Sequence, residues 1–383
     1  MQLPENLRRI RLAQKLSQVA VAEKAGISRM GYRKIEAGES EPRSETLMAI
    51  ARALDVRVEE LLIPVRPLTH VRFREQRRLH TRAQVLASVA RQLDHYELLE
   101  ELLGQRPPAL LPTLRDKLSR LRGPSRPIKA ARLAREALGL DDGDLIRDIC
   151  GLLEDNGVKV LTPNVATDGF FGMSVADDDG GPAVVVNTWE RISVERWIFT
   201  AAHELAHLLL HLSAYEVNRT EEDEGQEKEA DTFAGYFLMP EATFNSEWEE
   251  ASGLSWYDRV FKLKRIFRVS YRTVLYRIST ELPANRKAEP WKRFNAEYKR
   301  KNGRPLPGTV EPEGLAPDVF LRRPAARSAE EPQSLGRHDF MQDRLARLVR
   351  KALDRDAITL SKAAEVLDLD LKSMRDLSNS WVD

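Results

Sequence analysis

The chain has 383 residues, of which 42% are hydrophobic and 31% are charged, and its formal net charge is +1. This composition fits a globular protein of two or three domains and excludes a chain that binds polyanions over its whole surface. The single cysteine, Cys150, excludes an internal disulfide and is typical of a reducing environment. We find neither an apolar run of membrane-spanning length nor a signal segment, so we expect a cytoplasmic protein with no membrane partner.

Residues 5–62 are predicted to form a compact bundle of short helices. Ser17, Ser28 and Ser44 each precede an apolar-periodic segment, which is where N-cap residues stand. Gly26 lies in the turn between the first two of these helices. The spacing is that of a helix-turn-helix, so we expect residues 1–65 to form a five-helix DNA-binding bundle.

The following segment is basic. Residues 63–135 contain 16 Lys or Arg against 6 Asp or Glu. Next to a DNA-reading module, such a segment is expected either to add phosphate contacts or to be an ordinary solvated helical surface. We interpret residues 66–128 as a basic helical connector.

From residue 129 the pattern changes to helices mixed with short strands. The predicted strands are 158–163, 169–176 and 182–188, and the predicted helices are 193–212 and 226–238. Residues 129–282 are therefore expected to form an α+β domain. Six prolines between Pro305 and Pro332 indicate a linker, assigned to 283–335, and 336–383 are expected to be a small helical C-terminal region. The predicted fold class is mainly α with one α+β domain built on a small sheet.

The segment 199–211, FTAAHELAHLLLH, contains the spacing of a helical zinc site. His203 and His207 are one helical turn apart on one face, and Glu204 is rotated so that it reaches a water molecule bound to the metal. The alternative is an ordinary buried helix that happens to carry histidines. His211 is also four residues from His207, but no carboxylate stands beside that pair, so we interpret it as a packing or supporting residue.

A catalytic zinc site needs a third protein ligand. Residues 221–231 hold seven acidic residues, so composition does not choose among them. Glu229 is four residues before Phe233, which we expect to be buried, and this spacing directs Glu229 inward. On the same reasoning Glu227 is expected to point elsewhere. Glu229 is therefore the predicted third ligand.

Segment 199–211, followed by KEADTFAGYFLMP at 228–240, resembles the paired motifs of the ImmA/IrrE family of metallopeptidases. The resemblance covers about residues 129–281. It implies Zn²⁺ as cofactor, His203, His207 and Glu229 as ligands, and Glu204 as general base. The resemblance thus favours a zinc metalloendopeptidase, in which Glu204 takes a proton from zinc-activated water.

Residues 5–62 resemble the XRE/Cro–C1 helix-turn-helix family. The resemblance implies a recognition helix at 28–35, in which Arg29, Tyr32 and Arg33 face the major groove. Gln18 and Ser28 are expected to contact phosphates or base edges, and the module to bind double-stranded operator DNA as a homodimer. The alternative is a bundle that binds protein and has lost its DNA contacts.

The two resemblances together imply a DNA-binding transcriptional regulator that carries a peptidase domain. Its expected substrate is a helix-turn-helix repressor, another protein or its own chain, cleaved in a stress or mobile-element response. The alternative is a transcription factor or antitoxin-like repressor whose metallopeptidase-like domain senses a ligand, metal or partner without cleaving anything.

Overall fold

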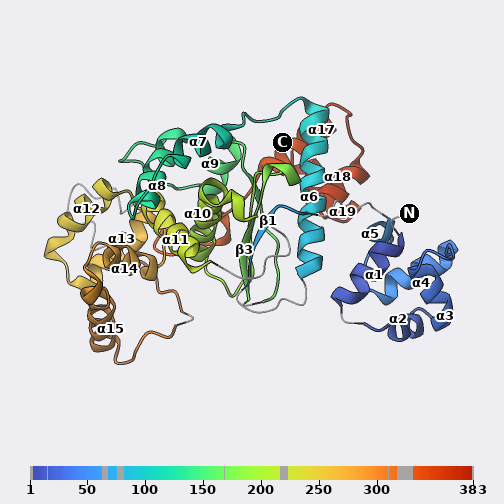
Figure 1. Cartoon of the computed structure of the whole chain (residues 1–383), viewed down its shortest axis with the longest axis horizontal. Helices are drawn as coiled ribbons and strands as arrows, with labels where there is room; N and C mark the ends of the chain where they lie inside the picture. Colours follow the sequence, from blue (N-terminus) through green and yellow to red (C-terminus); the bar gives the residue numbers. More distant parts are fainter. Residues whose placement is uncertain are drawn as a thin grey trace.

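The computed structural model describes residues 3–14, 16–62, 68–75, 82–167, 169–215, 223–308, 310–316 and 331–381. An N-terminal helical bundle lies beside a larger body in which helices cover both faces of a small sheet (Figure 1). The prediction of a mainly α protein with one α+β domain is confirmed. Among the helices described, none has the length and apolarity needed to cross a bilayer.

The N-terminal bundle has the five predicted helices. They are α1 (Leu3–Ala13), α2 (Gln18–Lys24), α3 (Arg29–Glu36), α4 (Ser44–Ala53) and α5 (Val58–Leu62), and they enclose a hydrophobic core of their own. The hydroxyl oxygens of Ser17 and Ser28 accept hydrogen bonds from the backbone at the starts of α2 and α3, as N-caps do. Gly26 has a φ of 67°, which glycine adopts without strain. Ser44 begins α4 and is not its cap.

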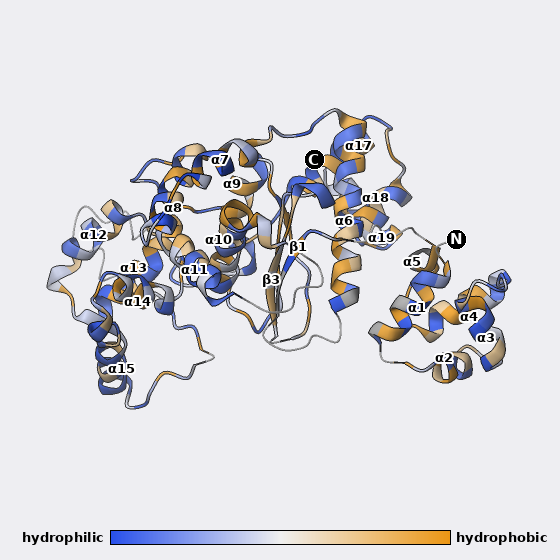
Figure 2. Ribbon diagram, viewed as in Figure 1, coloured by the Kyte–Doolittle hydropathy of each residue, from blue (hydrophilic) through white to orange (hydrophobic). Residues whose placement is uncertain are grey.

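The sheet has four strands: β1 (Val71–Glu75), β2 (Lys159–Leu161), β3 (Phe170–Val175) and β4 (Ala183–Val186). Their order is β1-β3-β4-β2, and β3 pairs antiparallel with both β1 and β4, whereas β2 and β4 are parallel. Successive residues of β4 enter opposite cores: Val184 belongs to one and Val185 to the other. Both faces are covered, which explains why β4 is an unbroken apolar run. The neighbouring strand β3, which is labelled in Figure 2, is largely orange there.

The helices divide between the two faces. One core contains residues of α7 (Leu110–Ser119), α8 (Arg126–Ala137), α9 (Ile149–Asp155), α10 (Val194–Leu210), α11 (Glu224–Leu238), α12 (Glu241–Glu250), α13 (Trp256–Phe267), α14 (Tyr271–Thr280) and α15 (Glu289–Asn302). The other contains residues of α6 (Arg82–Leu103), α17 (Arg344–Asp354), α18 (Leu360–Val366) and α19 (Leu371–Ser380).

Three segments that the sequence set apart from the α+β domain are built into the same body. The basic segment 66–128 supplies strand β1 and helices α6 and α7, and the C-terminal α17 packs on α6. The segment 283–335, interpreted as a proline-rich linker, contains α15, and the side chain of Phe294 in this helix is fully buried. Local composition therefore did not reveal that these segments pack on the α+β domain.

Helices α18 and α19 repeat the geometry of α2 and α3. In each pair a seven-residue helix is followed by one residue with positive φ and then by a cap that starts the second helix. The residues at the first cap, the positive-φ turn and the second cap are Ser17, Gly26 and Ser28 in the first pair, and Thr359, Asp368 and Asp370 in the second. Helices α18 and α19 thus have the backbone geometry of a second helix-turn-helix unit.

Candidate functional site

Helix α10 carries the histidines and is buried on every side. Ser193 caps it by accepting a hydrogen bond from the backbone N–H of Arg196. The helix packs between strand β3 on one side and helix α11 on the other. Its residues His203, Glu204 and His207 are all at most 1% exposed. Buried polar side chains are stable only when they have hydrogen-bond partners or bind a ligand.

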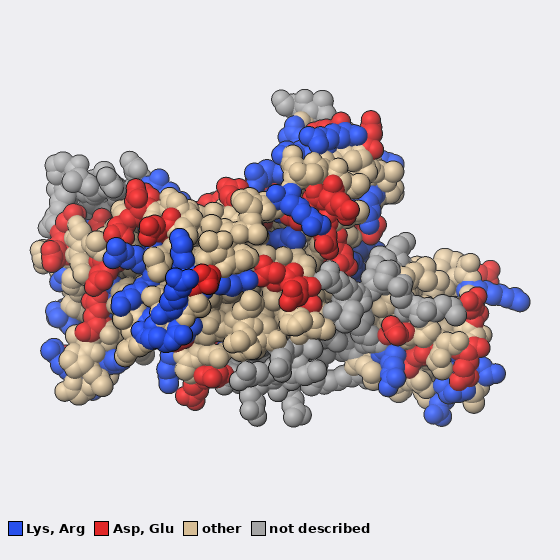
Figure 3. Space-filling model, turned by 45° about the horizontal axis from the view of Figure 1, so that its top comes forward, with Lys and Arg blue, Asp and Glu red and all other residues tan. Residues whose placement is uncertain are grey.

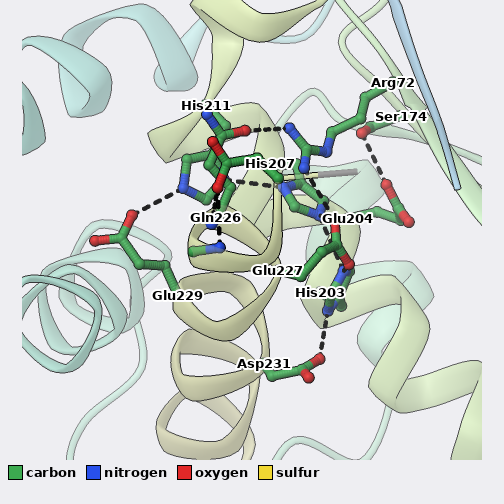
Figure 4. A network of polar contacts seen from close by, with 12 residues as sticks. Arg72, Ser174, His203, Glu204, His207, His211, Gln226, Glu227, Glu229 and Asp231 are labelled. Atoms are coloured by element: carbon green, nitrogen blue, oxygen red, sulfur yellow. Dashed lines mark hydrogen bonds and ion pairs between the residues drawn. The ribbon is translucent and has the colours of Figure 1, made fainter. Parts of the chain in front are cut away.

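Three side chains converge at one point (Figure 4). The Nε2 atoms of His203 and His207 lie 2.9 Å apart. Each lies 3.3 Å from a carboxylate oxygen of Glu227. The three groups form the metal-ligand cluster that the described residues contain, with one donor atom from each within 4.8 Å of the others. We call them the triad.

The structure places Glu227 in the triad, whereas the predicted third ligand was Glu229. The carboxylate of Glu229 instead lies 2.9 Å from Nε2 of His211 and pairs with Arg126. Side chains two residues apart on a helix point in widely different directions, so only one of the two glutamates reaches α10. The expectation that Glu227 points elsewhere was wrong.

The missed signal was the small-residue face of α11. Glu227 precedes Ala230 and Ala234 by three and seven residues, so all three lie on one side of the helix. Both alanines are fully buried. Small residues mark where two helix backbones approach closely, and α11 makes that approach to α10. Phe233, which guided the choice of Glu229, packs on a different side.

A second layer of groups orients the histidine rings. Nδ1 of His203 is 2.9 Å from a carboxylate oxygen of Asp231, and Nδ1 of His207 is 2.9 Å from Nδ1 of His211. Such partners fix the ring orientation and leave Nε2 for the ligand side. His211 therefore supports the triad from outside it, as its spacing predicted.

Glu204 lies against the sheet. Its Oε2 accepts a hydrogen bond from the hydroxyl of Ser174 at 2.8 Å, and the hydroxyl of Tyr215 donates to Ser174 at 2.6 Å. Gly172 makes this approach possible, because a Cβ there would lie 2.5 Å from a methyl carbon of Thr200. The glycine of the FFGMS segment thus lets β3 lie close to the helix that carries Glu204.

The electrostatics of the triad favour a cation between its members. Burial lowers the pKa of His207 well below its usual value, so the ring is neutral and able to act as a ligand. Burial alone raises the pKa of Glu227, but hydrogen bonds from His203 and His207 hold it far below its usual range. Two imidazoles and one carboxylate are donors that zinc accepts.

The spacing of the donor atoms agrees with this reading. A tetrahedral zinc ion with bonds of about 2.0–2.1 Å separates its ligand atoms by about 3.4 Å. The two His–Glu227 distances are 3.3 Å, and the His–His distance is 2.9 Å. Three protein ligands leave a fourth position for water, as catalytic zinc sites do. The residues present therefore fit the metal.

A cavity of about 520 Å³ lies beside the triad and reaches Asp231. Its walls carry Arg191, Arg196 and Arg272, together with aromatic side chains that include Phe171, Phe199 and Trp291. The guanidinium of Arg196 lies over the rings of Phe171 and Phe199, at 4.8 and 5.6 Å from their centroids. This volume is in the range of small-molecule sites.

The predicted DNA-contacting residues differ in how far they are exposed. Arg29 and Arg33 are exposed on one face of α3, where Arg33 pairs with Glu39 at 2.9 Å. Ser28 caps α3, and the half-buried Gln18 donates to Glu36 at 3.0 Å. Tyr32, expected to face the major groove, is fully buried, because α3 is rotated so that this side chain points into the bundle core. Its side chain does not reach the surface.

Over the face of the molecule shown in Figure 3, basic and acidic side chains are interspersed. This agrees with the formal net charge of +1. Contacts with a polyanion are therefore expected to come from local groups, such as the arginines of α3, and not from a field of one sign.

Comparison with known proteins finds family matches for two segments of the chain. The model of the helix-turn-helix family matches residues 7–61, and the model of peptidase family M78, the IrrE N-terminal-like domain, matches residues 154–279. The chain carries these two domains, as the sequence resemblances indicated.

Individual relatives support the first assignment. The chain is 43% identical over 58 residues to the uncharacterized HTH-type transcriptional regulator YqaE of Bacillus subtilis, covering 15% of this chain and 50% of that protein. It is 39% identical over 61 residues to the cryptic phage CTXphi transcriptional repressor RstR of Vibrio cholerae, covering 16% and 54%. The chain thus spans about half the length of these curated relatives.

Among solved structures, the apo form of ComR from S. thermophilus aligns with 14% identity over 79% of this chain and 95% of that chain. The TM-score of 0.15 is too low to indicate a shared fold.

Proposed function

We propose that this chain, which joins a helix-turn-helix domain to an IrrE N-terminal-like domain, is a DNA-binding transcriptional regulator whose second domain is a zinc-dependent endopeptidase. The observation that carries the proposal is the triad, with Glu204 one residue after its first histidine. A domain kept only as a scaffold has no physical need for two imidazoles, a carboxylate ligand and a nearby base in one buried place.

In this proposal His203, His207 and Glu227 hold the zinc ion. A zinc ion held there would supply Lewis acidity toward water and the peptide carbonyl. Glu204 would accept a proton from the attacking water and pass it to the amine of the leaving peptide. Ser174 holds Oε2 of Glu204 at 2.8 Å, so the carboxylate keeps one orientation through the proton transfers.

The chemistry of the rest of the chain suggests what is cleaved. The helix-turn-helix domain brings the peptidase to an operator, as a homodimer on a pseudo-palindromic site. The expected substrates are a helix-turn-helix repressor bound nearby or this chain itself. Cleavage of either removes a DNA-bound protein and changes transcription.

A second function is favoured by the cavity beside Asp231. Its three arginines outnumber its two acidic residues, Asp231 and Glu311, and together with the aromatic walls they suit a small anionic molecule. Asp231 contacts His203. A regulator that senses such a ligand without cleaving anything, including an antitoxin-like repressor, would use the same elements. This alternative needs no proton acceptor at Glu204.

The two functions differ in their dependence on Glu204. Cells that express the wild-type chain or Glu204→Gln are compared by mass spectrometry of new protein N-termini. The proposal expects termini within a helix-turn-helix protein, or within this chain, that the wild type generates and the variant does not. Identical sets of termini, with transcription regulated equally by both, would favour the sensing function.

A further inference from the structure

The segment that matches the family model contains only part of the observed sheet. The IrrE-like match begins at residue 154, so within it the sheet consists of β3, β4 and β2 in that order. Strand β3 is the outer strand of that set. In the whole chain, however, β1 is added to its outer side from residues 71–75, which lie between the helix-turn-helix domain and α6.

This outer side of β3 is the side on which an extended peptide would lie at the candidate site. Ser174 of β3 contacts Glu204 of α10, so the strand runs directly past the proposed base. Peptides commonly bind by adding a strand to an open sheet edge, where backbone hydrogen bonds hold them extended. In the structure β3 and β4 both have neighbouring strands on both sides.

Strand β1 occupies that edge in the way a peptide would. It runs antiparallel to β3, with Val71 opposite Val175 and Arg72 opposite Ser174. The Arg72 side chain enters the site (Figure 4), where its guanidinium donates to Glu227 at 2.9 Å and to Gln226. Arg72 thus binds the carboxylate of the triad from the strand that lies opposite Ser174.

The burial of the site agrees with an occupied edge. The side chains of Arg72 and Glu227 are both 12% exposed, and those of His203 and His207 are 0% and 1% exposed. A protein substrate has to reach these atoms. With β1 in place its backbone cannot pair with the outer edge of β3, and its side chains meet Arg72.

We propose that the outer edge of β3 is the peptide-binding edge of this site, and that residues 71–75 fill it as a built-in extended peptide anchored by Arg72 on Glu227. This inference rests on the proposed peptidase function. It predicts the class of substrate: an extended segment, antiparallel to β3, with a basic side chain opposite Ser174. It also makes the state of β1 depend on the DNA-binding domain, because residues 63–70 join β1 to α5.

A tethered strand competes strongly with a free peptide. A short linker gives its segment an effective concentration in the millimolar range. An added peptide therefore binds only when β1 leaves the edge. Replacement of residues 71–75 by Gly-Ser-Gly-Ser-Gly keeps the length of the linker and removes the competitor. Arg72→Glu is a milder variant, because a carboxylate there is repelled by Glu227.

The test measures binding and not cleavage. The probe is a fluorescein-labelled peptide of residues 69–75 (THVRFRE), titrated by fluorescence anisotropy into full-length proteins that all carry Glu204→Gln. The added changes are the Gly-Ser replacement, Arg72→Glu, or Arg120→Glu as a control at an exposed arginine. Circular dichroism establishes that each protein is folded.

We expect the two strand variants to bind the peptide at least 10-fold more tightly than the parent and the Arg120→Glu control, and amide exchange at residues 170–175 to be faster in both. A probe with Arg72→Glu is expected to bind weakly. Equal peptide affinity in all four proteins, or unchanged exchange in the strand variants, would overturn the inference. Failure of the proposed function would appear separately, as absence of cleavage by strand variants that retain Glu204.

Discussion

Glu227 and Glu229 lie two residues apart on α11 and meet different partners. Glu227 contacts the Nε2 atoms of His203 and His207, whereas Glu229 contacts Nε2 of His211. The two carboxylates are chemically alike, so a substitution at each position separates a direct ligand from a supporting group.

Glu227→Gln is expected to lose most of its zinc affinity, because the substitution removes an anionic oxygen donor from a three-ligand site. Glu229→Gln is expected to reduce affinity by about 10- to 100-fold at most, since it acts through His211 and His207. Competition with a chromogenic chelator measures both. If Glu229→Gln lost zinc and Glu227→Gln kept it, the ligand set implied by the family resemblance would be restored.

Ser174→Ala is expected to slow cleavage by about 10- to 100-fold while zinc remains bound, because Glu204 loses the hydroxyl that orients it. The rate is measured on the protein whose cleavage depends on Glu204. Ser119→Ala, which removes an exposed hydroxyl, serves as the matched control. An unchanged rate in Ser174→Ala would show that Glu204 needs no such support.

Glu154 links stability to pH. Burial raises its pKa to about 7, against the hydrogen bonds that it accepts from Tyr96 and from the backbone of Arg344. Between pH 4.5 and 7 the folded chain holds a proton that the unfolded chain has lost, so the contribution of this group to stability falls as pH rises. The loss amounts to about 3 kcal/mol.

Glu154→Gln removes this titration and keeps an acceptor for Tyr96. Relative to wild type, the variant is expected to gain about 3 kcal/mol of stability between pH 4.5 and pH 8. Urea unfolding at the two pH values measures the difference. The exposed Glu249→Gln should show no such change, and a Glu154→Gln difference that is the same at both pH values would contradict the assignment.

The two helix-turn-helix units offer matched positions for a DNA-binding test. Arg33 in α3 and Arg375 in α19 are both exposed, and each lies five residues after the cap of its helix. Arg33→Ala is expected to weaken binding to a selected operator by about 1–3 kcal/mol, if this arginine reads a base.

Arg375→Ala is expected to leave that affinity unchanged. The cap of α19 is Asp370, whose carboxylate would repel the phosphate that lies near the cap of a recognition helix, and Leu371 stands where α3 has Arg29. Electrophoretic mobility shifts with both variants measure the effect. Equal losses would show that the C-terminal unit also binds DNA, and no loss at Arg33 would contradict the recognition-helix assignment.

The local features of the chain were predictable from its sequence. The caps at Ser17 and Ser28, the turn at Gly26 and the one-turn spacing of His203 and His207 are properties of single helices, and the structure has them all. The same holds for the three short strands that follow residue 157, because their apolar runs are set by burial on both faces of a sheet.

What the sequence did not reveal depends on contacts between distant segments. Strand β1 is formed by residues that are basic and lie in the predicted connector, and they form a strand because β3 offers an unpaired edge. The choice of Glu227 depends on how α11 is rotated about its axis, which the packing of Ala230 and Ala234 decides. The prediction for Tyr32 failed for a similar reason. The rotation of α3 about its axis turns this side chain into the core of the N-terminal bundle.

Zinc K-edge X-ray absorption of the zinc-loaded chain identifies the ligands of the proposed metal site. We expect a first shell of two imidazole nitrogens with oxygen donors at about 2.0–2.1 Å and no sulfur. Loss of one oxygen donor is expected in Glu227→Gln. A shell with three imidazoles, which would bring in His211, or a spectrum unchanged by Glu227→Gln, would contradict it.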